Sequence, residues 1–119
     1  MADIIGFIGA LVGLGLGLLG LARPAAALRL VGLTTRPDIP HGVAEVRGTY
    51  GGLFVGFEAV ILLSGMPALY AVGAGAWFGA AAGRSFSVAW DGVRGRETFI
   101  AVAFEVTVGL AHLAPVLAA

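Results

Sequence analysis

The chain has 119 residues, of which 59% are hydrophobic and only 12% charged, whereas soluble domains carry about 25% charged residues. It contains no cysteine, which excludes disulfides, thiol chemistry and cysteine zinc sites. The formal net charge is zero and there is no basic run, so the electrostatic footprint of a nucleic-acid-binding protein is missing. A single domain over residues 1–119 is expected at this length.

The first apolar segment is close to the roughly 20 residues that a helix needs to cross a bilayer. Only Asp3 precedes it as a charged side chain, whereas a signal peptide begins with a positive region, so we predict a retained span. Arg23 and Pro24 end it, because proline breaks a helix interior. Residues 25–33 are expected to form one or two helical turns on the membrane surface.

A loop with two prolines and a glycine follows at residues 34–42, and three more apolar segments come after it. Ser64 to Pro67 forms a tight turn, and Asp91-Gly92 ends the third long segment. The fold class is therefore an all-α membrane protein, a four-transmembrane-helix bundle in up-down-up-down order. The predicted spans are about 4–22, 43–63, 68–90 and 98–117.

The arginines predict the orientation, because loops rich in arginine and lysine stay on the cytoplasmic side. All of them fall on or near the first and third loops, so both termini are expected on the outer side. The alanine-, glycine- and arginine-rich, lysine-free composition is typical of a bacterium with a GC-rich genome, so we expect a bacterial membrane protein. The arginines are Arg23, Arg29, Arg36, Arg47, Arg84, Arg94 and Arg96.

Glycines recur at every fourth residue in three of the apolar segments. Such positions share one face of a helix, and small residues there allow two membrane helices to approach closely. We therefore predict that these stripes face other helices of the chain, with Gly13 and Gly52 among the most crowded positions. The stripes are Gly9, Gly13 and Gly17, then Gly48, Gly52 and Gly56, and then Gly75, Gly79 and Gly83.

Charged side chains inside a span are costly, so they are candidates for function and need partners. Arg84 and Glu105 each lie about 10 Å from the cytoplasmic ends of their spans at 1.5 Å per residue, and we predict an ion pair between them. Glu58 and His112 fall together nearer the middle of the bilayer. Arg47 and Asp91 form a further predicted pair at the cytoplasmic boundary, with Tyr50 as a hydrogen-bonding partner.

Two interpretations of these groups stay open. Polar pairs between membrane helices can lock their packing, or the groups can handle protons or bind a ligand. A metal site at Glu58, Glu105 and His112 has suitable ligand types, but the spans contain only one imidazole, so no metal is predicted.

Three motifs resemble the bacterial membrane proteins grouped as domain-of-unknown-function family 4345. They are Glu45-x-Arg47-x-x-Tyr50-Gly51-Gly52, then Gly83-Arg84-x-x-Ser87-x-x-x-Asp91-Gly92, and Glu105 in the last span.

The resemblance implies a four-helix inner-membrane protein of unestablished function. The family is distantly similar to small DoxX-type proteins, some of which are subunits of quinone-linked oxidoreductases. It implies a linked set of Arg47, Tyr50, Arg84, Asp91 and Glu105. Glu58 and His112 have no counterpart in the pattern.

Three functions are compatible with the sequence. We expect a non-enzymatic accessory or scaffold subunit of a larger membrane complex, because a small chain without a soluble domain has many ways to pack against a partner. The alternatives are a lipid- or quinone-binding protein, with Arg84, Glu105 and Tyr50 around the ligand, and a small proton-coupled carrier that uses Glu58, Glu105 and His112. Expected partners are membrane lipids and other membrane subunits or further copies of the chain. No cofactor is predicted beyond a bound lipid or quinone.

Overall fold

The computed structural model describes residues 1–119 and is all-helical. A continuous helical rod runs from His41 to Ser64, and its central part is a π-helix. Three helices are long and apolar enough to cross a membrane, Ala2–Ala22, His41–Ser64 and Arg96–Ala118. The elements are α1 (Ala2–Ala22), α2 (Pro24–Leu30), α3 (His41–Glu45), η1 (Val46–Gly52), α4 (Leu53–Ser64), α5 (Pro67–Trp90) and α6 (Arg96–Ala118).

The helices end where the sequence predicts. Gly65 follows α4 in the left-handed conformation, with φ of 63°, and Pro67 opens α5 at a position where its missing N–H is not needed. Gly92 has φ of 71° just after α5. The surface turns predicted over residues 25–33 are present as α2.

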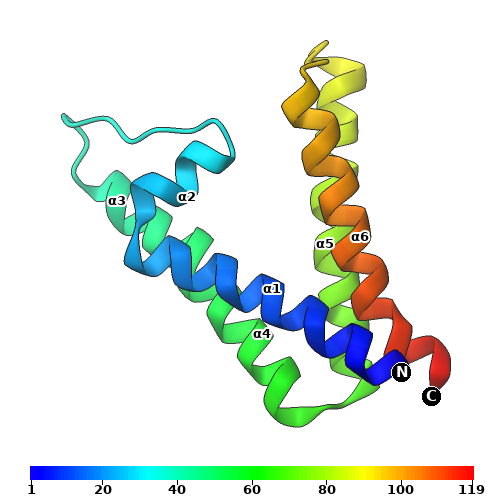
Figure 1. Ribbon diagram of the computed structural model, residues 1–119. Coiled ribbons are helices and arrows are strands. Elements are labelled where there is room, and N and C mark those ends of the chain that lie inside the picture. Colours follow the sequence, from blue (N-terminus) through cyan, green and yellow to red (C-terminus); the bar gives the residue numbers. More distant parts are fainter.

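The helices form two pairs that meet at one end of the molecule and diverge toward the other (Figure 1). In the first pair, α1 lies along η1 and α4, and in the second, α5 lies along α6. The N-terminal half of α1 also packs against α6, which joins the pairs. Both termini lie at this joined end, whereas the α2–α3 and α5–α6 loops lie at the divergent end.

The molecule is therefore a flat wedge and more open than the predicted bundle, with extents of 49 × 31 × 16 Å. Only 21 of its 119 residues are buried, so most apolar side chains point outward, as lipid-facing side chains do. Close contact between the pairs is confined to the joined end, where the glycines of α1 let other helices approach.

The glycine stripe of α1 packs against the rest of the chain as predicted. A Cβ at Gly9 would lie 2.9 Å from that of Ala111, and one at Gly17 would lie 2.8 Å from the backbone nitrogen of Val55. A Cβ at Gly13 would overlap the carboxylate of Glu58. The same face continues to Gly6, which contacts Pro115 of α6, and to Gly20, which contacts the backbone of Tyr50.

The packing prediction is wrong for the other two stripes. No atom of another helix lies within 4 Å of a Cβ built at Gly48, Gly52, Gly56, Gly75, Gly79 or Gly83. On α5 the glycine stripe and the buried face lie on opposite sides of the helix. The buried face carries Gly73, Ala74, Trp77 and Ala81. On the second rod, Gly48 and Gly52 lie within the π-helix, where the four-residue spacing of an α-helix does not apply, and Gly56 follows it. The close approaches come instead from Gly51, Gly73 and Gly109.

Candidate functional site

The most buried polar side chains of the protein meet where the two helix pairs join. Glu58 of α4 and His112 of α6 are both fully buried, and His112 Nε2 lies 3.0 Å from Glu58 Oε2. Trp77 of α5 donates from Nε1 to Glu58 Oε1 over 3.1 Å. The second nitrogen of the imidazole, Nδ1, lies 2.9 Å from the carbonyl oxygen of Val108. Three helices thus contribute to one polar cluster, which we call the Glu58 cluster (Glu58, Trp77, Val108 carbonyl and His112).

Glycines make the space for this cluster. A Cβ at Gly9 would lie 3.1 Å from His112 Nδ1, and one at Gly13 would overlap Glu58. From the opposite side, a Cβ at Gly73 would lie 3.1 Å from His112 Nε2. Any larger residue at these positions would displace the carboxylate or the imidazole, so the glycines of α1 and α5 shape the site.

The predicted ion pair between α5 and α6 is present. Arg84 donates from Nε to Glu105 Oε1 over 2.7 Å. The Glu105 side chain is only 7% exposed, whereas that of Arg84 is 35% exposed. The pair therefore joins a buried carboxylate to a guanidinium that reaches the surface. Glu105 Oε2 is buried and has no hydrogen-bond partner.

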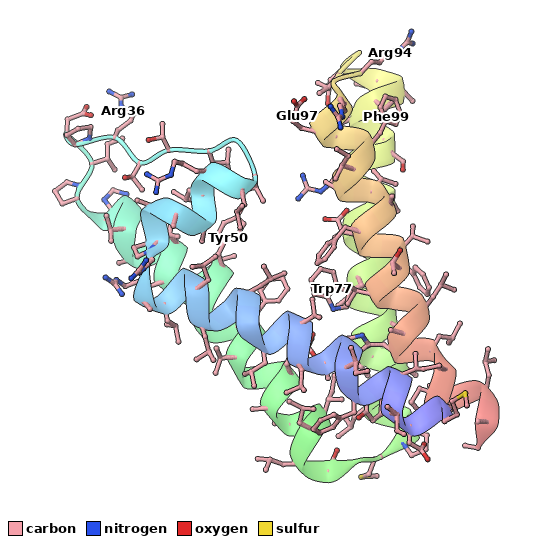
Figure 2. The ribbon with its side chains drawn as sticks, viewed as in Figure 1. Arg36, Tyr50, Trp77, Arg94, Glu97 and Phe99 are labelled. Atoms are coloured by element: carbon pink, nitrogen blue, oxygen red, sulfur yellow. The ribbon has the colours of Figure 1, made fainter.

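An aromatic layer connects the two helix pairs at the level of Trp77. The ring of Trp77 meets Phe54 of α4 edge-on at 5.6 Å and Phe104 of α6 edge-on at 5.9 Å. Figure 2 shows the Trp77 side chain on α5, on the side that faces the first helix pair. Edge-to-face contacts of this kind stabilise a fold by more than the burial of their apolar area alone. Trp77 thus has both a hydrogen-bonding role and a packing role.

The linked set implied by the resemblance is only partly assembled. Arg84 and Glu105 are joined, but Arg47 donates to the carbonyl of Leu21, at the C-terminus of α1. Asp91 accepts a hydrogen bond from Ser87 over 2.7 Å. The predicted Arg47–Asp91 pair is therefore wrong, because the two side chains lie on different helix pairs, where the pairs diverge.

Tyr50 has no hydrogen bond to these charges and is 38% exposed. It instead lines a pocket of about 290 Å³ beneath the loop after α2, together with Thr35 and Arg36. In this loop Arg36 holds Asp38 at 2.6 Å, and this hydrogen bond lowers the pKa of the Asp38 carboxyl. Both side chains are exposed, so this contact shapes the loop and not the site.

No three histidine, cysteine or carboxylate side chains come close enough together to hold a metal ion. Glu58 and His112 pair with each other, and Glu105 pairs with Arg84. The role of Trp77 was not predicted. The sequence does contain a signal for it, because Trp77 carries a hydrogen-bond donor on the same helix face as Arg84, for which a partner on another helix was predicted.

Long apolar helices define a helical protein with three candidate membrane spans. The chain belongs to the family described as Domain of unknown function (DUF4345), whose family model matches residues 1–114. No curated protein and no solved structure matches it.

Proposed function

We propose that the chain crosses a bacterial inner membrane four times, with both termini outside, and that it is a non-enzymatic accessory subunit of a larger membrane complex. The fourth span is α5, which is less apolar than the others because of its glycines and Arg84. It has 24 residues, enough for about 36 Å of helix, and it lies along α6. Its one intramembrane charge is paired with Glu105.

The orientation rests on the loops at the divergent end. Arg36 and Arg94, both at this end, are labelled in Figure 2, far from the two termini. Under the positive-inside rule, this end faces the cytoplasm. The same end carries the arginines of α2 and of the α5–α6 loop.

Single cysteines test this topology, because the natural chain has none. Ala119→Cys is expected to react with a membrane-impermeant maleimide added outside intact cells. Gly92→Cys is expected to react only after the membrane is opened. Labelling of Gly92→Cys in intact cells would contradict the orientation. Protection of Ala119→Cys in intact cells would contradict the outer position of the C-terminus.

The accessory role is carried by the outward face of α5. Its glycine stripe, Gly75, Gly79 and Gly83, lies opposite the face that packs within the chain, and nothing from the chain covers it. Phe86 and Trp90 stack at 5.8 Å on this outward face, at the cytoplasmic end of the stripe. In lipid, small residues at four-residue spacing are characteristic of helix–helix contacts. A glycine stripe unused within the chain is therefore suited to a helix of another subunit.

Gly79→Leu is expected to leave the chain folded and to remove its partner. Native mass spectrometry after mild extraction from the original membrane should find the natural chain in a stoichiometric complex with a second protein. The Gly79→Leu variant should lack this complex, because a leucine would keep the backbone of α5 away from that of the partner helix. Ala80→Leu is the matched control, exposed on the same turn but beside the stripe. A bare monomer, a complex of identical copies, or equal effects of both variants would contradict the accessory role.

A lipid- or quinone-binding role is the second candidate. It is favoured by the Arg84–Glu105 pair, in which the terminal nitrogens of Arg84 have no partner in the chain and the guanidinium is partly exposed. A polar head group with an acceptor oxygen would complete these hydrogen bonds. The same mass spectra test it, because a retained lipid or quinone that is lost in Arg84→Met would support this function.

A further inference from the structure

We propose that Glu58 and His112 bind one proton between them as a single unit, and that separating the two helix pairs releases this proton at neutral pH. This makes the Glu58 cluster a proton-binding site in the interior of the protein. The inference is independent of the accessory role, because it depends only on hydrogen bonds within the chain.

The hydrogen bonds of the cluster determine the number of protons. The carbonyl of Val108 can only accept, so His112 Nδ1, at 2.9 Å, carries a hydrogen. Trp77 Nε1 can only donate, so Glu58 Oε1 is an acceptor. The remaining contact, 3.0 Å between His112 Nε2 and Glu58 Oε2, needs one hydrogen. That hydrogen belongs either to an imidazolium beside a carboxylate or to a carboxylic acid beside a neutral imidazole.

Either placement leaves the cluster with no net charge. Removal of the proton would leave two acceptors facing each other and one buried negative charge. A second proton would place two donors together with one buried positive charge. Both groups are fully buried, and an unpaired charge in such a place is very costly. The closed protein is therefore expected to keep one proton over a wide pH range.

The surroundings offer no compensating charge. From α1 the cluster is faced by Gly9 and Gly13, which have no titratable group. From α5 it is faced by Trp77 and by the ring of Tyr70, 6.1 Å from that of His112. Glu105, two turns away on the same face of α6, is already paired with Arg84.

Separated helices bind a different number of protons. An exposed glutamate ionises near pH 4.3 and an exposed histidine loses its proton near pH 6.5. Above about pH 6.5 the separated pair thus holds no proton, whereas the closed pair holds one. Separation then releases one proton. The ratio of separated to closed protein therefore rises about tenfold for each unit of pH increase.

Nitrogen-15 NMR of the protein in lipid nanodiscs tests the proton count directly. The chain has two histidines, so His41→Gln leaves His112 as the only labelled imidazole. We expect Nδ1 to be protonated, and neither ring nitrogen to titrate near pH 6.5, where an exposed histidine does. An imidazole that titrates near pH 6.5 like an exposed one, or one without hydrogen on Nδ1, would overturn the proposal.

Glu58→Gln provides a second test, because an amide can satisfy the same contacts without the shared proton. Its oxygen can accept from Trp77 and its nitrogen can donate to a neutral His112. Reversible unfolding in SDS would be followed at several pH values for this variant and for the natural chain. We expect the ratio of their unfolding constants to change about tenfold per pH unit above pH 6.5, because only the natural chain releases a proton. A ratio that does not depend on pH would refute the shared proton.

Discussion

Arg84→Met should destabilise the protein by up to about 3–5 kcal/mol, the cost of removing one partner of a fully buried ion pair, because Glu105 is buried although Arg84 is 35% exposed. The variant leaves Glu105 with a buried carboxylate, 7% exposed, and no counter-charge. Its second oxygen, Oε2, already has no hydrogen-bond partner, so nothing else in the chain compensates for the loss. Reversible unfolding in SDS, followed by circular dichroism, measures the change.

Removing the other partner of the pair should cost less stability. In Glu105→Leu the remaining charge is Arg84, whose side chain is already 35% exposed and can extend along the helix to the water interface. The double variant Arg84→Met/Glu105→Leu should be more stable than Arg84→Met, since apolar replacement of a whole buried pair is often neutral or better. Additive effects in this double-mutant cycle would show that the pair is not coupled.

Gly17→Ala should have the second large effect, a loss of about 1–3 kcal/mol from overpacking. The new methyl group would lie 2.8 Å from the backbone nitrogen of Val55 and 2.9 Å from Phe54 Cβ. A flexible side chain can move away from such a contact, but a backbone nitrogen moves only if α4 moves. The first helix pair would therefore have to separate along its whole contact.

Gly15→Ala is the matched control in the same helix. No atom lies within 4 Å of a Cβ built at Gly15, so the added methyl group meets no neighbour. Alanine is also a better helix former than glycine by about 1 kcal/mol, so this variant should be as stable as the natural chain or slightly more so. Thermal unfolding of both variants in the same detergent distinguishes the effect of packing on stability from the effect of helix propensity. Equal stabilities for the two would show that α1 does not need a glycine at position 17.

Predictions that depended on position along a helix axis agree with the structure. The apolar lengths, together with Pro24, Gly65, Pro67 and Gly92, fixed the helix ends, because these residues have strong local conformational preferences. The depths of Arg84 and Glu105 could be counted at 1.5 Å per residue, and the two side chains do meet.

Predictions that depended on which helix is the neighbour were less successful. Arg47 and Asp91 lie near one level, but the first helix pair diverges from the second there, and no local pattern encodes that divergence. Glycine spacing has a similar limit. It marks a helix face as smooth without specifying what covers it, so the stripe of Gly75, Gly79 and Gly83 was correctly seen but assigned to the wrong surface.

The π-helix η1 determines the angular phase of α4. Leu53 donates its backbone N–H to Gly48, five residues back, so this turn holds one residue more than an α-helical turn. One extra residue rotates everything after it by about 100° around the helix axis. Glu58 comes after η1, so its direction toward His112 depends on this insertion as much as on its own position in the sequence. The Glu58 cluster therefore depends on the irregular turn, and deletion of one residue from η1 would point the Glu58 carboxylate toward lipid.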